Sequence, residues 1–171
     1  MARLRKFSAY QKLERPYTRV SKFSKKNYVR GGFPQIKIVR FDMGNPKGNF
    51  DLTLRLNAQK SMQIRHNAFE AARMTSNRLL EKNLGKAYHL KIKVFPFHVL
   101  RENPLAAGAG ADRMSTGMKK SFGKPIGSAA QVSVGQTLFE LRVNKEHLKL
   151  AKEALNRAAK KIPCSCKIIS A

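Results

Sequence analysis

Few side chains in this sequence have the types and spacing that metal binding requires. Cys164 and Cys166 form a C-x-C pair, which supplies two of the four ligands of a structural zinc site. The chain has no other cysteine, and its 4 histidines are widely separated. The same spacing on one strand places two side chains on one face, where reduced thiols pack well. We therefore expect buried thiols, and assign neither a metal site nor a disulfide.

Groups for acid–base or nucleotide chemistry are equally sparse. His66 and Glu70 are spaced for one helix face, but the H-E-x-x-H pattern of zinc proteases is absent, so we interpret them as a surface pair on an RNA-facing helix. Gly123-Lys124 resembles the end of a P-loop, yet no Ser or Thr follows, and Met118 occupies the position of the upstream glycine. The acidic residues are scattered singly, which disfavours a two-metal nuclease site. We predict a protein that is not an enzyme and uses no cofactor or small-molecule substrate.

Charge is the strongest chemical signal in the chain. The 171 residues include 35 Lys and Arg against 10 Asp and Glu, a formal net charge of +25. Such self-repulsion is expected to persist where a polyanion neutralises it, which means nucleic acid or an anionic membrane surface. No apolar run approaches the roughly 20 residues that span a bilayer, and no secretory signal follows the first residues. We therefore expect a cytoplasmic protein with a nucleic-acid partner and no membrane association.

The first 34 residues form a basic N-terminal extension. They contain one acid, Glu14, and six of the 14 aromatic residues, interleaved with the cations at no steady period. One interpretation is a solvated tail; the one we favour is a segment that becomes ordered on RNA, with cations on phosphates and rings on bases. Its predicted RNA-binding residues are Arg3, Arg5, Lys6, Lys12, Arg15, Arg19, Lys22, Lys25, Lys26 and Arg30.

Residues 35–171 have the periodicity of a single α+β domain. We expect a mainly antiparallel sheet with two helices packed on one side. The predicted elements are a hairpin of strands 36–41 and 52–56, a helix over 61–84, a strand over 90–94, an edge strand over 97–101, a hairpin of strands 130–134 and 139–143, a helix over 145–161 and a last strand over 164–169.

Each predicted helix has an apolar and a basic side. The apolar faces are Ile64, Ala68, Ala71, Thr75 and Leu79 in the first helix, and Leu148, Ala151, Leu155, Ala158 and Ile162 in the second. The other side of the first helix carries Arg65, His66 and Arg73, which we predict to face RNA. The apolar face of the second helix is largely Ala and Leu, which suits a core better than a membrane surface.

A long glycine-rich loop, residues 103–127, separates two of the strands. A loop of this length in a compact domain is usually functional or disordered. No acid occurs between Asp112 and Glu140, so the segment is cationic. We predict that it reaches into folded RNA. The residues assigned to RNA contact here and at its start are Arg101, Arg113, Met114, Lys119, Lys120 and Lys124.

Four motifs carry a resemblance to a known family. They read DMGN at 42–45, QIRHNAFEAAR at 63–73, HVLREN at 98–103, and GAGADRMSTGM with FGKP over 108–125. In this order they strongly resemble the large-subunit ribosomal protein family called "L ten-e" in archaea and eukaryotes, the counterpart of bacterial "L sixteen". Within that family, the sequence looks archaeal in type.

The resemblance implies an α/β-hammerhead fold and binding to large-subunit ribosomal RNA near the central protuberance and the A-site tRNA. It implies a loop directed toward the peptidyl-transferase region, close to A-site and P-site tRNA, in a protein that supports translation and subunit assembly beside neighbouring ribosomal proteins. Arg113 and Met114 match the family's Arg-Met in that loop, while Lys119-Lys120-Ser121 replaces its usual Arg-Gly-Ala. Because lysine lacks the guanidinium fork, it cannot bind a phosphate bidentately as arginine does.

Overall fold

The described residues form two antiparallel sheets and two α-helices. The structure is a computed structural model that describes residues 5–18, 23, 29, 31–103 and 123–170. The strands are β1 (Asp42–Gly44), β2 (Leu52–Ala58), β3 (Met62–Arg65), β4 (His89–Ile92), β5 (His98–Glu102), β6 (Lys124–Val132), β7 (Thr137–Val143) and β8 (Cys166–Ser170). The helices are α1 (His66–Leu84) and α3 (Leu148–Ala159), with 3-10 turns η1 (Phe7–Ala9) and η2 (Lys145–His147).

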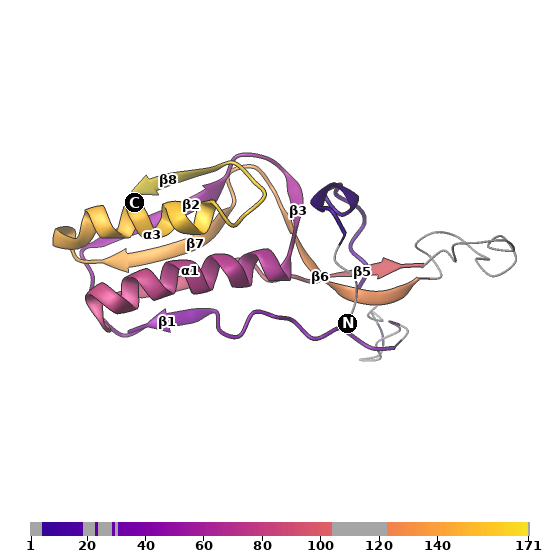
Figure 1. Ribbon diagram of the computed structural model, residues 1–171, viewed down its shortest axis with the longest axis horizontal. Helices are drawn as coiled ribbons and strands as arrows, with labels where there is room; N and C mark the ends of the chain where they lie inside the picture. Colours follow the sequence, from indigo (N-terminus) through magenta and orange to yellow (C-terminus); the bar gives the residue numbers. More distant parts are fainter. Residues whose placement is uncertain (1–4, 19–22, 24–28, 30, 104–122, 171) are drawn as a thin grey trace, which may run out of the picture.

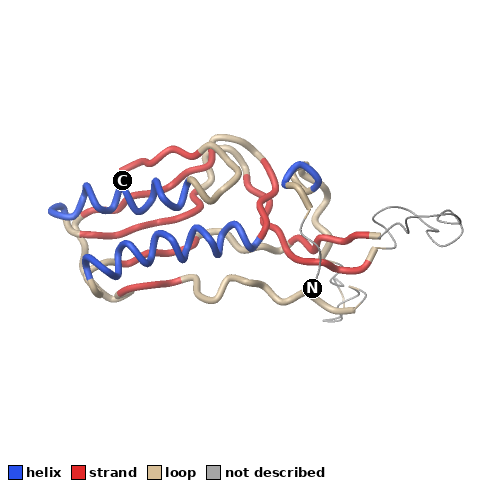
Figure 2. The backbone as a smooth tube through the Cα atoms, in the orientation of Figure 1, coloured by secondary structure: helices blue, strands red, loops and turns tan. Residues whose placement is uncertain are grey.

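The larger sheet has five strands in the order β1-β4-β7-β2-β8, and the smaller has three in the order β3-β6-β5. Both α1 and α3 lie on the same side of the five-stranded sheet, while β5 and β6 extend away from it (Figures 1 and 2). The predicted α+β class, with two helices on one side of antiparallel strands, is confirmed. The strands divide into two sheets rather than the one that we expected.

Strand β2 shows how the larger sheet is built. Leu54 and Leu56 are fully buried, while Thr53 and Arg55 alternate with them and point away from the helices. Leu141 and Phe139 of β7 lie directly opposite the two leucines. This face packs on the helices and forms the core, in which each fully buried leucine or phenylalanine contributes about 1.5–3 kcal/mol.

The first helix begins five residues later than predicted and buries a different face. Residues 62–65 are strand β3, and the buried side of α1 is His66, Phe69, Ala72, Ser76 and Leu80. The expected stripe of Ala68, Ala71, Thr75 and Leu79 is only partly buried. The face predicted for α3 is correct, because Ala151, Leu155 and Ala158 are fully buried there.

Both predicted hairpins are wrong. Residues 36–41 form no strand, and β1 pairs with β4 rather than with β2. Strand β6 pairs with β3 and β5, while β7 pairs with β2 and β4, so the turn between them passes from one sheet to the other. The chain also passes from one sheet to the other after β2. At that point Ala58 N donates to Gln136 O at 3.0 Å and Gly135 N donates to Ala58 O at 2.8 Å, so the two crossings are hydrogen-bonded to each other.

Candidate RNA-binding surface

Residues 5–17 of the basic N-terminal extension pack against the three-stranded sheet. Gln63 N of β3 donates to Gln11 O at 3.1 Å, and Val99 N of β5 donates to Tyr17 O at 3.2 Å. Tyr17 N in turn donates to His98 Nδ1 at 2.9 Å. This part of the extension is therefore folded onto the domain that we expected to begin at residue 35.

A cluster around Glu102 holds the extension at the end of β5. Tyr10 is buried, and its hydroxyl donates to Glu102 Oε2 at 3.3 Å. Arg5 forms an ion pair with the same carboxylate, and the Arg65 guanidinium lies 4.7 Å from the centre of the Tyr10 ring. Burial, together with the nearby carboxylate, raises the pKa of Tyr10, so the phenol stays protonated as a donor. Arg5 and Arg65 therefore already have protein partners.

The other described cations of the extension are more open. Lys6, Lys12 and Arg15 are exposed, and within the described part of the chain none of them has an acidic partner. At the end of β5, the Arg101 guanidinium lies 3.4 Å from the centre of the Tyr17 ring. Lys124 is exposed and opposite Glu102 in the β5–β6 register, so residues 124–127 are strand rather than the end of a loop.

His66 does not form the surface pair with Glu70 that we expected. The side chain is buried, with 7% of the residue exposed, and its Nδ1 has no hydrogen-bond partner. Gly127 of β6 lies against the ring, where an added Cβ would be 3.5 Å from Nε2. Burial, followed by the charges of Lys37 and Arg65, lowers the pKa of His66, so the ring is neutral at pH 7. The geometry favours a packing role over a phosphate contact.

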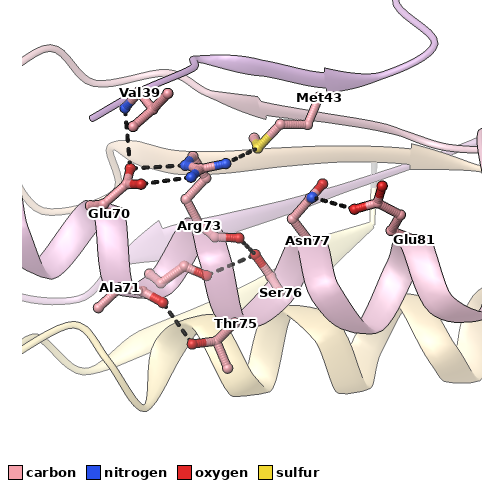
Figure 3. A network of polar contacts seen from close by, with 10 residues as sticks. Val39, Met43, Glu70, Ala71, Arg73, Thr75, Ser76, Asn77 and Glu81 are labelled. Atoms are coloured by element: carbon pink, nitrogen blue, oxygen red, sulfur yellow. Dashed lines mark hydrogen bonds and ion pairs between the residues drawn. The ribbon is translucent and has the colours of Figure 1, made fainter. Parts of the chain in front are cut away.

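Glu70 instead pairs with Arg73, and each side chain is only 12% exposed. Arg73 Nε donates to Glu70 Oε2 at 2.8 Å and Nη2 donates to Oε1 at 2.6 Å, and Val39 N donates to Oε2 at 3.3 Å. Figure 3 shows Arg73 between Glu70 and Met43, whose sulfur is 3.5 Å from Nη1. The Arg73 hydrogen bond is the main cause that lowers the pKa of Glu70. The pair thus ties α1 to the chain before β1 through Glu70 and to β1 itself through Arg73. The contact of Arg73 with RNA stays a prediction.

Exposed cations of α1 and α3 border a groove between the two helices. The groove has a volume of about 830 Å³. Arg78 and Lys82 of α1 are exposed beside it, while Arg157 of α3 donates to Glu153 at 2.7 Å. Other lysines in and next to α3 are also exposed: Lys145, Lys149, Lys152 and Lys160.

The face of the five-stranded sheet away from the helices carries cations that the sequence analysis did not select. Arg142, Lys93 and Arg55 surround Glu140, at 2.8, 3.6 and 3.8 Å from its carboxylate oxygens. Burial alone would raise the pKa of Glu140, but the Arg142 hydrogen bond and the charges of Lys93, Arg142 and Arg55 hold it below its ordinary value. Three cations therefore surround one ionised carboxylate, which leaves this cluster positively charged. Lys91 pairs with Asp42 on the same face.

The two cysteines are free thiols, and among the described residues no three His, Cys, Asp or Glu side chains gather into a metal-binding group. Burial raises the pKa of Cys166 to about 12, which disfavours the thiolate that zinc binds. No helix in the described part of the chain is long and apolar enough to cross a membrane.

Ten of the predicted RNA-binding residues lie outside the described residues. They are Arg3, Arg19, Lys22, Lys25, Lys26, Arg30, Arg113, Met114, Lys119 and Lys120.

Comparison with known proteins decides the family. The model of the family described as ribosomal protein L16p/L10e matches residues 15–169. The chain belongs to the ribosomal protein L16p/L10e family. It is 50% identical over 155 residues to large ribosomal subunit protein uL16 of Staphylothermus marinus, covering 90% of this chain and 85% of that one. The uL16 proteins of Archaeoglobus fulgidus and Hyperthermus butylicus are 45% and 47% identical, over 94% and 90% of this chain and 88% and 82% of theirs.

Membership in the L16p/L10e family confirms the resemblance drawn from the four motifs. The motif residues also include side chains that are buried or paired within the fold, such as His66 and Arg73. The cations of the sheet face were missed although a signal existed. Arg55, Lys91 and Lys93 occupy the polar positions of alternating strands, which place them together on one face.

Proposed function

We propose that this protein is a non-catalytic structural constituent of the large ribosomal subunit, where it binds ribosomal RNA in the cytoplasm. The observation that carries the proposal is the family match over residues 15–169. The net charge of +25 agrees with it, because neutralising a large positive charge requires a polyanion.

The exposed cations supply the phosphate contacts. Lys6, Lys12 and Arg15 of the extension, the exposed basic residues of α1 and α3, and the cations around Glu140 are on three different surfaces. Contacts on several surfaces suit a protein that is enclosed by folded RNA, and they position it without reading sequence. His66 and Arg73 contribute by holding α1 in place.

A more specific location follows from the family resemblance. The protein binds near the central protuberance and the A-site tRNA, next to other ribosomal proteins, and residues 103–127 are directed toward the peptidyl-transferase region, with A-site and P-site tRNA nearby. In this position it supports translation and subunit assembly. The Glu102 cluster favours this arrangement, because it fixes the end of β5, which directly precedes this segment in the sequence.

Salt-dependent binding to large-subunit ribosomal RNA tests the proposal. If about eight phosphates are neutralised, the logarithm of affinity should fall with the logarithm of salt concentration at a slope of roughly −7. Purified protein should also co-sediment with the large subunit, and structured RNAs of other origin should compete poorly. A slope near zero, or equal binding to every structured RNA, would contradict the proposal.

A further inference from the structure

Three phenylalanine rings form a partly exposed cluster at the connection between β4 and β5. Phe41 and Phe95 are stacked, with ring centroids 5.4 Å apart and an interplanar angle of 21°. Phe97 lies against Phe95 at 4.7 Å and 51°. Phe95 is 41% exposed and Phe97 is 65% exposed. Exposing these apolar rings to water costs free energy in proportion to the exposed area. A partner that covers the rings therefore gains that free energy on binding.

The local sequence fixes the positions of these rings. Along residues 91–98, exposed Lys93, Phe95 and Phe97 alternate with buried Val94 and Pro96. Phe97 N donates to Phe95 O at 3.1 Å, which closes a tight turn around the proline. Because the rings already contact each other, a ligand that covers them orders few additional side chains.

The charges beside the rings in the sequence are mainly positive, and the acid that follows Phe41, Asp42, is paired with Lys91. Lys93 is the next exposed residue before Phe95, and exposed Arg40 precedes Phe41. The Lys93 ammonium is 3.6 Å from Glu140, whose carboxylate Arg142 already holds at 2.8 Å. Lys93 can therefore move to a phosphate without leaving Glu140 unpaired.

We propose that Phe95 and Phe97 bind an unpaired nucleotide of the ribosomal RNA, with its base stacked on the exposed Phe97 ring and a neighbouring phosphate on Lys93. Aromatic rings beside cations are the arrangement that proteins use for single-stranded RNA, because every base offers a flat π-face. Positive charge beside the rings complements a polyanion better than it does an apolar protein surface. This inference rests on the proposed binding to ribosomal RNA and adds a base-stacking site that is separate from the phosphate contacts.

Substitutions at position 97 separate stacking from simple apolar contact. The affinity of purified protein for large-subunit ribosomal RNA should fall about tenfold in Phe97→Leu and in Phe97→Ala, and should be retained in Phe97→Tyr. Lys93→Gln should reduce the salt slope by about 1. Val134→Ala is the matched control, because Val134 is as exposed as Phe97, at 65%, and lies in the turn between β6 and β7, outside the basic surfaces described above. Circular dichroism of each variant checks that it is folded.

The outcomes distinguish this inference from the broader proposal. If the wild-type protein binds ribosomal RNA and Phe97→Leu binds equally well, the stacking site is refuted and the proposed function stands. If the wild-type protein fails to bind ribosomal RNA, the proposed function itself fails. In the assembled subunit, chemical probing should find an unpaired nucleotide that Phe97→Leu exposes; a neighbouring protein in contact with Phe97 would also overturn the assignment.

Discussion

Replacing Glu70 with glutamine tests whether the Glu70–Arg73 pair stabilises the fold. An exposed ion pair contributes about 0–1 kcal/mol, whereas removing one partner of a buried pair costs about 3–5 kcal/mol. Both side chains are 12% exposed, and Glu70 accepts bonds from Arg73 and from Val39 N. We therefore expect Glu70→Gln to lower the free energy of unfolding by about 2–3 kcal/mol.

Urea denaturation at pH 7 measures the effect in a double-mutant cycle of four proteins: wild type, Glu70→Gln, Arg73→Met and the double variant. The double variant should lose about 1–2 kcal/mol less unfolding free energy than the sum of the two single losses. Glu153→Gln is the matched control, because the side chains of the Glu153–Arg157 pair are 53% and 47% exposed, respectively. Losing this exposed pair should cost less than about 1 kcal/mol of unfolding free energy.

The same pair predicts a pH dependence of stability. The Arg73 hydrogen bond holds the pKa of Glu70 below its ordinary value of 4.5. A carboxylate whose pKa is lower in the folded state than in the unfolded state stabilises the fold at pH values above the unfolded pKa. This contribution is lost as the pH falls through the folded pKa. The difference in unfolding free energy between wild type and Glu70→Gln should therefore shrink below about pH 4.

Equal losses of unfolding free energy in Glu70→Gln and Glu153→Gln would refute the reasoning about the Glu70–Arg73 pair. An Arg73→Met protein with full stability and a weaker salt slope for RNA binding would refute it as well.

Two further changes test close contacts. Gly44→Ala should lower the free energy of unfolding by more than about 2 kcal/mol, because Gly44 has φ +83° and its added Cβ would lie 2.1 Å from Tyr88 O. Gly135→Ala is the control, with φ +80° and open space, and should cost about 1 kcal/mol; equal losses in thermal unfolding would show that the contact is unimportant. Glu102→Ala should speed amide hydrogen exchange across residues 5–17, because it removes the acceptor for both Arg5 and Tyr10. Unchanged exchange there would show that other contacts hold the extension.

Local periodicity predicted the elements that bury one continuous face. Leu54 and Leu56 alternate with polar residues in β2, and the apolar residues of α3 recur at helical spacing. Each spacing therefore fits only one type of element with one buried face. The start of α1 was missed because Ile64 and Ala68 also fit helical spacing. Residues 62–65 form a strand only because β6 lies beside them and pairs with them. Strand preference depends on such neighbours more than helix preference does.

For the candidate RNA-binding surface, too, the sequence predicted some features and the contacts between distant residues decided others. Composition and motifs were sufficient to predict RNA as the partner and the family to which the chain belongs. They could not separate exposed cations from those with protein partners, since this depends on residues distant in the chain. Glu102 reaches Arg5, and β6 brings Gly127 against His66. His66 and Arg73 are basic residue types like their exposed neighbours, so sequence spacing alone treated them alike.

The sequence by itself determined the excess of positive charge, the apolar faces of β2 and α3 and the family membership, because these depend on residue types and on short, regular spacings. Only the tertiary structure decided that the chain crosses between two sheets, that residues 5–17 fold back onto β3 and β5, and that Lys93 lies beside Glu140. Each of these depends on pairing between distant strands, where the energy comes from contacts that no local pattern specifies.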